Sequence, residues 1–497
     1  MPYSVLIAVL ATFKKLPKHN IKTLTDGLRH AILTEALQAD DCLPSSRQLA
    51  NALGLARSTI VTVYEQLIAE GYLQARAGSA TRVAPNLTLP VQWQTPPPTH
   101  ALAAADSHTT NNLHLQRLAQ QELTPLPHQP FSVAVPQDQV QLDAHWHRIS
   151  KRIVQSPLYA PTGYGPAQGD LPLREQLVEY LRQARNVHCH AEQIIITDGA
   201  QQALYLASKV LLQAKDTAII ENPVYPGLHA VLQDRQVNIR AIKLDEQGMQ
   251  VPTLLADNIS ARAVFVTPSH QYPMGMPLSM ARRMALLQWA KQQHAWIVED
   301  DYDSELRYQG LPFPAMQGLS PQQVIYIGTF SKVLAPSLRL GYVVVPPVLI
   351  DAFRGAKSII SRSSANLTQH TIAAYMQAGY FNNHIRRIRM VYAERKAYLS
   401  TLLSQAIPQL SLLPSDQGMH VVAMLPPCTD DVAIAATARA HGIALRAISP
   451  MCVGQAHLSG LMFGFGGFNH TQLQTAVSRL QPIIAAALQH SASQSGL

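Results

Sequence analysis

The sequence predicts an α/β protein that joins a small helical N-terminal unit to a large domain with a mostly parallel sheet. From about residue 131 onward, short apolar runs alternate with longer amphipathic runs, which is typical of strands joined by helical crossovers. A proline-rich stretch separates this region from a shorter amphipathic one. We therefore expect four parts: an N-terminal extension (1–22), a small domain (23–84), a linker (85–130) and a large domain (131–490).

The composition fits a folded protein with more than one core. At 497 residues the chain is too long for a single core, and 47% hydrophobic with 14% charged residues argues against disorder. A net charge of +8 suits a polyanionic partner. The four cysteines lack metal-like spacing, as expected in a reducing cytoplasm. The apolar start is too short for a membrane span and lacks the leading charges of a secretory signal.

The small domain has the pattern of three helices and two short strands. Apolar residues recur at Leu24, Leu28 and Ile32, which is the spacing of an amphipathic helix. A Pro-Ser-Ser sequence at 44–46 is a good helix start with a serine N-cap, and Gly54 favours a helix end. The expected elements are helices over 24–39, from the Ser45 or Ser46 cap to 54, and over 59–70, followed by two strands around Gly78-Ser79.

The segments at 43–50, 57–67 and 70–83 resemble, in order, the winged helix-turn-helix pattern of GntR-type regulators. Ala56 departs from that pattern, as does the Asp-Asp-Cys turn at 40–42. The resemblance implies that the third helix lies in the major groove of double-stranded operator DNA. It places Arg57, Ser58 and Thr59 at bases or adjoining phosphates, and Arg47, Arg76 and Ser79 at phosphates. Taken singly, each arginine is also consistent with a solvated surface charge.

The linker and the large domain differ sharply in pattern. Repeated proline in the linker favours extended chain, with room for a short helix at 113–122. The large domain has continuous apolar strands, which favours a parallel sheet covered on both faces. The expected strands are 194–197, 217–221, 263–267, 296–300, 324–329 and 341–345, with helices over 200–212 and 279–293.

Lys332 follows a predicted strand and precedes Arg339 by seven residues, within Gly-Thr-Phe-Ser-Lys. Together with an Asp-Gly-Ala-Gln turn at 198–201, this pattern resembles the cofactor site of the type I aminotransferase fold, which binds pyridoxal 5'-phosphate (PLP). The resemblance implies a smaller C-terminal α/β subdomain, and it makes Lys332 the catalytic lysine that forms a Schiff base with PLP. It assigns the phosphate to Arg339, Thr329, Ser331, Gly199, Ala200 and Gln201.

Four further residues match cofactor positions of that fold. Asp300 ends a predicted strand where the family places the partner of the pyridinium nitrogen, and Tyr302 is expected at the phenolic oxygen of the ring. Tyr225 matches the aromatic residue that stacks on the ring face, although a tyrosine after a strand is also often core. Tyr164 resembles a tyrosine that reaches the phosphate of a neighbouring subunit, which implies a dimeric site.

The loop at 267–275 reads Thr-Pro-Ser-His-Gln-Tyr-Pro-Met-Gly, with Tyr272 where aminotransferases carry an asparagine. This form, and the arginine-rich segment at 384–395, resemble the MocR subgroup of GntR-type regulators. The subgroup implies a transcriptional regulator that forms a domain-swapped homodimer, binds operator DNA at the cytoplasmic nucleoid, and responds to PLP or an amino compound.

The substrate end of the site departs from a working aminotransferase. Met462 stands where an arginine usually binds the substrate carboxylate, and Gly227 stands where some amino-acid-sensing regulators carry an arginine. Two hypotheses follow: PLP is itself the signal, or an amino compound binds through other residues such as His270, Arg354 or Arg362. An aminotransferase with an auxiliary DNA-binding domain is the alternative enzyme function, with weak or half-reaction turnover conceivable. A DNA-binding protein with a cofactor-free body is a third reading.

Overall fold

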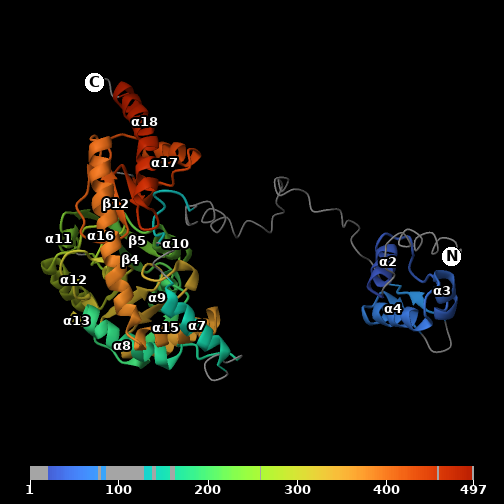
Figure 1. Cartoon of the computed structure of the whole chain (residues 1–497). Coiled ribbons are helices and arrows are strands. Elements are labelled where there is room, and N and C mark those ends of the chain that lie inside the picture. The colour runs from blue at the N-terminus through green and yellow to red at the C-terminus, as the bar shows by residue number, and fades with distance from the viewer. Residues whose placement is uncertain are drawn as a thin grey trace. The chain divides into compact units, whose positions relative to one another are not determined.

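The structure is a computed structural model that describes residues 21–75, 80–85, 128–136, 142–156, 163–257, 259–455 and 458–494. The chain divides into two compact units, residues 1–109 and 110–497, which we describe separately (Figure 1). The predicted phosphate-binding residues Arg76 and Ser79, residues 1–20 of the N-terminal extension and most of the linker lie outside the described residues.

The first unit contains three helices and a two-stranded antiparallel sheet. Its elements are α2 (Ile21–Leu33), α3 (Ser46–Leu53), α4 (Arg57–Ala69), β1 (Leu73–Gln74) and β2 (Arg82–Val83). Ser45 caps α3 in a reciprocal capping box with Gln48, and Gly54 ends it in the left-handed conformation. The serine cap and the terminating glycine agree with the prediction, and the structure adds Gln48 as the reciprocal partner of Ser45.

The first helix is shorter than predicted. The sequence suggested 24–39, but α2 ends at Leu33 and Glu35 adopts a positive φ of 58°. The chain turns back here, so that Leu37 is buried in the core of the unit and its backbone N–H donates to Ala31. Burial of Leu37 in this core outweighs continuation of the helix, because tertiary packing routinely overrides helix propensity.

The second unit is built on an eight-stranded sheet with the order β3-β10-β9-β8-β7-β4-β5-β6. Its strands are β3 (Ile194–Thr197), β4 (Thr217–Asn222), β5 (Asn238–Asp245), β6 (Gly248–Met249), β7 (Ala263–Val266), β8 (Trp296–Asp301), β9 (Val324–Thr329) and β10 (Gly341–Val344). Strands β5, β4, β7, β8 and β9 run parallel, whereas β10 is antiparallel to both of its neighbours. The sheet is therefore mostly parallel, and the six predicted strands agree with it to within one residue at each end.

Helices cover both faces of this sheet. One face packs against α9 (Ala200–Leu211), α10 (Pro226–Asp234) and α14 (Ile350–Ile360), and Ile195 of β3 points into this layer. The other face packs against α11 (Val251–Ala256) and α12 (Met280–Gln293) at one end. At the other end it packs against α7 (Ala144–Gln155), α8 (Leu171–Arg185) and α15 (Asn366–Gln377). Side chains that alternate along each strand are thus buried on both sides.

A smaller C-terminal part completes the unit, as the sequence predicted. Its antiparallel sheet has the order β11-β12-β14-β13, with strands β11 (Ser411–Leu412), β12 (His420–Met424), β13 (Arg446–Ala447) and β14 (Gly460–Gly464). The helices α17 (Asp431–Ala440) and α18 (His470–Gln494) lie with it. The long helix α16 (Tyr380–Ala406) contacts α15 as well as α18, and so links the two parts of the unit (Figure 1). The short helix α13 (Met316–Leu319) precedes β9.

None of the helices in the described residues is long and apolar enough to cross a membrane.

Candidate DNA-binding and cofactor sites

Four of the six predicted DNA-contacting residues, Arg47, Arg57, Ser58 and Thr59, lie at the start of two neighbouring helices. Arg57 opens α4 and its Nε lies 3.4 Å from Ser46 Oγ at the start of α3. Arg47, Arg57 and Ser58 are exposed, and Thr59 is half-buried. Because Ala56 supplies no side-chain cap, the first N–H groups of α4 have no side-chain oxygen from that position. An exposed helix N-terminus beside two arginines suits a DNA phosphate or base edge.

An ion pair joins α2 to the end of α4. Arg29 of α2 makes a two-pronged contact with Glu70, at the end of α4, with its Nη2 2.8 Å from both carboxylate oxygens. Tyr64 on α4 points inward, and its hydroxyl donates to Pro44 O over 2.9 Å. The third helix is therefore fixed on its inner side, which leaves its N-terminal residues facing outward.

In the second unit, the predicted cofactor residues follow the carboxyl ends of β3, β8 and β9. Thr197 ends β3, Asp300 lies at the end of β8 and Thr329 ends β9. Ligands of open α/β sheets bind outside the carboxyl ends of parallel strands. The mostly parallel sheet therefore brings together residues that lie more than 100 positions apart in the sequence.

The predicted phosphate-binding residues form one cup. Gly199 caps α9 with a φ of 99°, and a Cβ at this position would lie 3.8 Å from the guanidinium of Arg339. Arg339 Nη2 donates to Asp198 O at 2.9 Å, and Thr329 Oγ1 donates to Ser331 Oγ at 3.0 Å. Ala200 opens α9, so its N–H belongs to the free N-terminus of that helix. A helix N-terminus, an arginine and two hydroxyls are the donors that a phosphate dianion requires.

Gln201, whose backbone N–H is predicted to meet the phosphate, makes a separate contact through its side chain. Its Nε2 donates to Gly227 O at 2.9 Å, so its amide ties the phosphate turn to the start of α10. Its Oε1 is buried and has no hydrogen-bond partner among the described residues. The side chain thus supports the site from behind, and its backbone N–H remains part of the helix start.

A buried network that the sequence did not reveal holds the cup in place. Ser364 Oγ donates to Asp198 Oδ1 at 2.7 Å, and Gln202 Nε2 donates to Asp198 Oδ2 at 3.0 Å. The fully buried Lys357 donates to Ser361 Oγ at 2.6 Å and to Ser364 Oγ at 3.0 Å. These residues come from α9, α14 and the loop after α14, so only the folded chain brings them together.

Asp300 carries an unsatisfied oxygen. Its Oδ1 is buried and has no hydrogen-bond partner among the described residues. Burial raises the pKa of Asp300 to about 7, the charge of Asp301 adds to this, and Lys332 opposes it. A cationic ring N–H at this position would satisfy the oxygen and bring the pKa back down. The orphaned carboxylate therefore fits a pyridinium partner.

Lys332 shares this environment. Burial lowers its pKa, while the carboxylates of Asp303 and Asp300 raise it. A lowered pKa increases the fraction of neutral amine near neutral pH, and the neutral amine is the form that attacks a carbonyl carbon. These surroundings fit the predicted role of Lys332 as the amine that meets the aldehyde of PLP.

Tyr302 belongs to a hydrogen-bonded chain with His270 and Asp303. His270 Nδ1 lies 2.9 Å from Asp303 Oδ2 and 3.0 Å from the Tyr302 hydroxyl. Because a carboxylate only accepts, Nδ1 must carry the hydrogen, and the Tyr302 oxygen then accepts from it as well. The hydrogen of Tyr302 must point elsewhere, and burial holds the pKa of Tyr302 well above its usual range. Tyr302 is thus fixed as a protonated donor.

Comparison with known proteins identifies the chain. The GntR family of bacterial regulatory proteins matches residues 20–83, and aminotransferase class I and II matches residues 158–480. The chain is 34% identical to the probable rhizopine catabolism regulatory protein MocR of Rhizobium meliloti, over 95% of this chain and 94% of that protein. The chain belongs to the MocR group of GntR-type regulators.

Two further similarities concern the functions of the two domains of this MocR-type chain. It is 31% identical to the pyridoxine biosynthesis transcriptional regulator PdxR of Corynebacterium glutamicum, over 93% of this chain and 95% of that protein. Its fold resembles Pyrococcus horikoshii kynurenine aminotransferase in complex with PMP, with a TM-score of 0.67 and 26% identity over 78% of this chain and 96% of that one. The N-terminal domain is therefore a DNA-binding domain and the cofactor of the large domain is PLP.

The residues of this MocR-type chain fit PLP. The orphaned oxygen of Asp300, the lysine beside it and the cup around Gly199 match the ring nitrogen, aldehyde and phosphate of that molecule. When bound, PLP supplies an aldehyde carbon to amines and an electron-withdrawing ring. Asp300, Lys332, Tyr302, Thr329, Ser331 and Arg339 would hold it. The roles of the individual residues remain predictions.

The tyrosines at the substrate side lie close together. Tyr225 precedes α10 and is 36% exposed, and its ring meets that of Tyr272 edge to face with centroids 5.5 Å apart. Tyr272 also meets the ring of Tyr302 edge to face at 5.7 Å. A bulky aromatic therefore fills the position where an aminotransferase has a small amide.

The two missing arginines have structural explanations. A Cβ on Gly227 would lie 2.3 Å from Gln201 Oε1 and 2.5 Å from the Tyr225 ring, so a side chain here would displace both. Met462 is fully buried in a cluster with Val422, and Tyr272 packs against that cluster. The regulator therefore lacks room for an arginine at one position and has an apolar core at the other.

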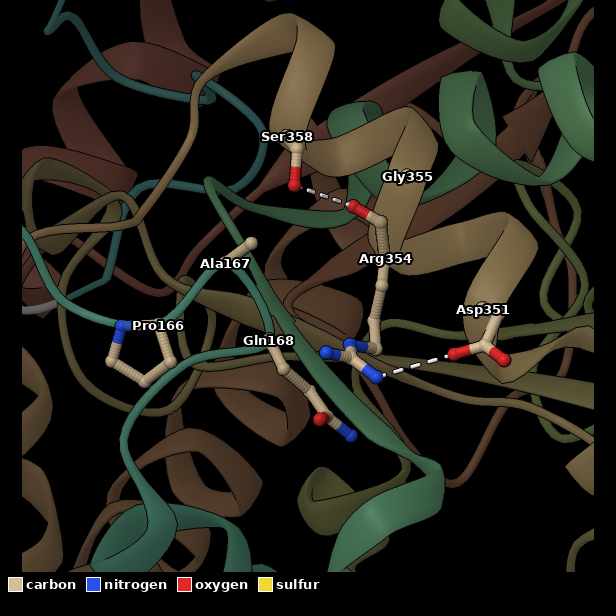
Figure 2. A pocket seen from close by; sticks show the side chains of 7 residues that line it. All are labelled: Pro166, Ala167, Gln168, Asp351, Arg354, Gly355 and Ser358. Carbon is tan, nitrogen blue, oxygen red and sulfur yellow. Dashed lines mark hydrogen bonds and ion pairs between the residues drawn. The ribbon is translucent and has the colours of Figure 1, made fainter.

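Arg354 and Arg362, two of the residues considered as alternative anchors for an amino compound, pair with other side chains. Arg354 lines a pocket with Gln168 and Ser358, and its Nη1 is paired at 3.2 Å with Asp351 (Figure 2). None of the predicted cofactor residues lines that pocket. The guanidinium of Arg362 lies 5.6 Å above the ring of Tyr164, which is 85% exposed. His270, in contrast, directly contacts Tyr302.

Proposed function

We propose that this MocR-type regulator binds operator DNA through its N-terminal winged helix and reports PLP, or an amino compound, through a Schiff base at Lys332. The observation that carries the proposal is the presence, in one chain, of a DNA-binding domain and of a lysine, a carboxylate and a phosphate cup whose surroundings fit PLP. Such a combination would allow sensing, because ligand binding at the cofactor site would change how the protein binds DNA.

The DNA-binding part of the proposal assigns base readout to the start of α4. Arg57, Ser58 and Thr59 would meet bases or adjoining phosphates, while Arg47, with Arg76 and Ser79 of the wing, would bind phosphates. Operators of such proteins are double-stranded DNA, so the working protein would reside at the cytoplasmic nucleoid. A homodimer would present two winged helices to two half-sites, with a spacing fixed by the DNA helical repeat.

The subunit arrangement is part of the proposal. The exposed ring of Tyr164, held over Arg362, would reach the phosphate site of the partner subunit in a domain-swapped homodimer. An exposed aromatic side chain loses unfavourable contact with water when another surface covers it. Tyr164 would therefore couple assembly of the dimer to occupation of the cofactor site.

Aminotransferase activity is the second candidate function. The retained Lys332 and Asp300 favour it, because transamination needs an amine that can move a proton and a carboxylate that keeps the ring nitrogen protonated. Against it stand Met462 and Gly227 in place of arginines, and Tyr272 in place of an amide. We therefore propose a regulator with at most slow, partial turnover.

The test is binding of the full-length protein to a labelled DNA fragment from the upstream region of its own gene, followed by fluorescence anisotropy with and without PLP. We expect specific binding that weakens steeply with salt, because arginines displace counterions from phosphates. Arg57→Ala should abolish sequence preference, whereas Arg152→Ala, on the exposed side of α7, should leave it unchanged.

A PLP-dependent change in affinity or footprint supports PLP as the signal. Binding that ignores PLP but responds to PLP with an added amine supports an amino compound. Rapid, sustained transamination of an amino acid and an oxo acid, at about 1 per second or more, together with no response of the DNA complex to any ligand, would contradict the regulatory proposal.

A further inference from the structure

Arg446 lies beside the position from which the usual carboxylate-binding arginine is missing. It belongs to β13, which pairs antiparallel with β14, and its direct cross-strand partner is Met462. Side chains of directly opposed residues in antiparallel strands project to the same face of the sheet, with Cβ atoms about 5 Å apart. The Arg446 side chain therefore starts from the same face as Met462, one strand away.

This face of the sheet lies toward the cofactor site. Met462 packs with Met274 and Met451, and Tyr272 packs against the same cluster. The ring of Tyr272 in turn contacts Tyr225 and Tyr302, the residues predicted to lie against the cofactor ring. A side chain that extends from β13 on this face thus points to the substrate side of the site.

The positive charge of Arg446 is felt by groups in the site. Burial lowers the pKa of Lys332, and the charge of Arg446 lowers it further. Burial raises the pKa of Tyr272, and the charge of Arg446 opposes that rise. The guanidinium of Arg446, placed by its pairing with β14, thus lies within electrostatic range of both groups.

Arg446 also lines a pocket of about 430 Å³ next to the site. Val224 and Pro226, which flank the stacking residue Tyr225 in the sequence, line the same pocket. Most of the remaining lining is apolar, and two further basic side chains border it. The residues are Val224, Pro226, His229, Val432, Ala435, Ala436, Arg439, Arg446, Ala447, Pro450 and Met451.

We propose that Arg446 is the carboxylate anchor of this regulator and that its effector is an amino acid with an apolar side chain, which occupies the pocket beside Tyr225. The inference rests on the proposed function and specifies its ligand. A guanidinium binds a carboxylate through two parallel hydrogen bonds, and that pairing is among the strongest polar contacts available. An anchor at Arg446 leaves Met462 free to be core, which explains why the arginine is absent there.

The anchor places the ligand's amine toward Lys332. Lys332 would hold PLP, and bound PLP would supply an aldehyde carbon for which the ligand's amine would compete with Lys332, so that one C=N bond would be exchanged for another and the lysine would be released as the free amine. The step needs no oxidant or further reactant. Apolar side chains of the pocket then exclude water from the ligand's own side chain.

The test compares L-leucine with 3-methylbutylamine, which differs from it only by loss of the carboxylate. Both are titrated into the PLP-loaded full-length protein, with the visible absorption of the cofactor and the thermal midpoint as readouts. The quantity of interest is the ratio of the two affinities in the wild type, in Arg446→Gln and in Arg446→Lys. Arg354→Gln, which removes the same charge from the pocket of Figure 2, is the matched control.

We expect Arg446→Gln to reduce leucine affinity about 10- to 100-fold, since hydrogen bonds between charged partners are of that strength, and to leave the amine unaffected. Arg446→Lys should restore part of the ratio, and Arg354→Gln should retain all of it. An unchanged visible spectrum without ligand shows that each variant is folded and loaded.

A wild-type protein with no preference for leucine, or a preference that persists in Arg446→Gln, overturns the inference. Either result leaves the proposed function intact as long as PLP still forms its visible band with Lys332. Failure to form that band in the wild type would instead contradict the proposed function itself, so the two failures are distinguishable.

Discussion

The cofactor end of the site matches the residue pattern of an aminotransferase more closely than the substrate end does. At the cofactor end, Lys332, Asp300 and the cup formed by Gly199 and Arg339 have surroundings that fit their predicted roles toward PLP. At the substrate end, Met462 is core and Gly227 is closed off by Gln201 and Tyr225. The contrast shows that the residues predicted to hold PLP match the aminotransferase pattern, whereas the residues at the substrate end differ from it.

The largest expected effect comes from removing the lysine at the cofactor end. Lys332→Ala should abolish the visible absorption of the PLP complex completely, because no other amine among the described residues has been placed beside Asp300 by the fold. Any response of the DNA complex to PLP should disappear with it. Absorption spectra and anisotropy check the result, with the exposed Lys209→Ala as the control that keeps both. A retained response in Lys332→Ala would show that sensing does not require the Schiff base.

The strand ends that carry the predicted cofactor residues were readable from the sequence, whereas the groups that support them were not. The strands that carry Thr197 and Thr329 are continuous apolar runs, so their ends could be placed from local pattern alone. Lys357 and Ser364, which hold Asp198, become neighbours of it only through packing of α14 against α9. The position of Arg446 opposite Met462 depends likewise on strand register, which sequence spacing does not specify.

The next largest effect concerns the substrate end. Met462→Arg restores the residue type of an aminotransferase but buries a charge in the cluster around Met274 and Val422. We expect a loss of roughly 3–5 kcal/mol in the free energy of unfolding, since a buried charge without a partner is that costly. Met462→Leu, which keeps volume and polarity, should cost less than about 1.5 kcal/mol. Chemical denaturation measures both. A stable Met462→Arg protein with gained transamination would remove the distinction between the two ends.

A smaller effect is expected for Asp300→Asn, which should raise the stability of the PLP-free protein and lower its affinity for PLP. Its pKa in the folded protein without PLP is raised to about 7, above the usual value of about 3.9 for an unfolded chain. Between these values the native state binds more protons than the unfolded state, so stability falls as pH rises from about 4 to 7. At pH 8 the PLP-free Asp300→Asn protein should therefore be more stable than the wild type, by roughly 1–3 kcal/mol.

The same substitution should weaken PLP binding, because an amide cannot balance the charge of the pyridinium nitrogen. We expect a loss of about 10- to 100-fold in affinity, the range of one charged hydrogen bond. Thermal midpoints of the PLP-free protein over pH 4–8 check the expected gain in stability. A titration with PLP at pH 8 checks the expected loss of affinity. Asp300→Glu is the control that keeps the charge. A loss of stability in the PLP-free variant at pH 8 would argue against a strained carboxylate at this position.

The smallest effect is expected for substitutions of His270, which contacts Tyr302 and so connects the substrate end of the site to its cofactor end. If the Nδ1–H of His270 holds the Tyr302 hydroxyl as a donor, that hydroxyl would stabilise negative charge on the ring oxygen of bound PLP. Loss of the donor favours protonation of the neighbouring C=N linkage, so the pH midpoint of the visible absorption should rise. We expect a rise of about 1–2 units in Tyr302→Phe and a rise of less than about 1 unit in His270→Gln, since hydrogen bonding shifts a pKa by such amounts. Asp303→Asn should resemble His270→Gln, because His270 then loses the carboxylate that sets its tautomer. A midpoint that moves in Tyr302→Phe but not in either of the other two would confine the tuning to Tyr302, and His270 would then be a structural residue of the rebuilt substrate end.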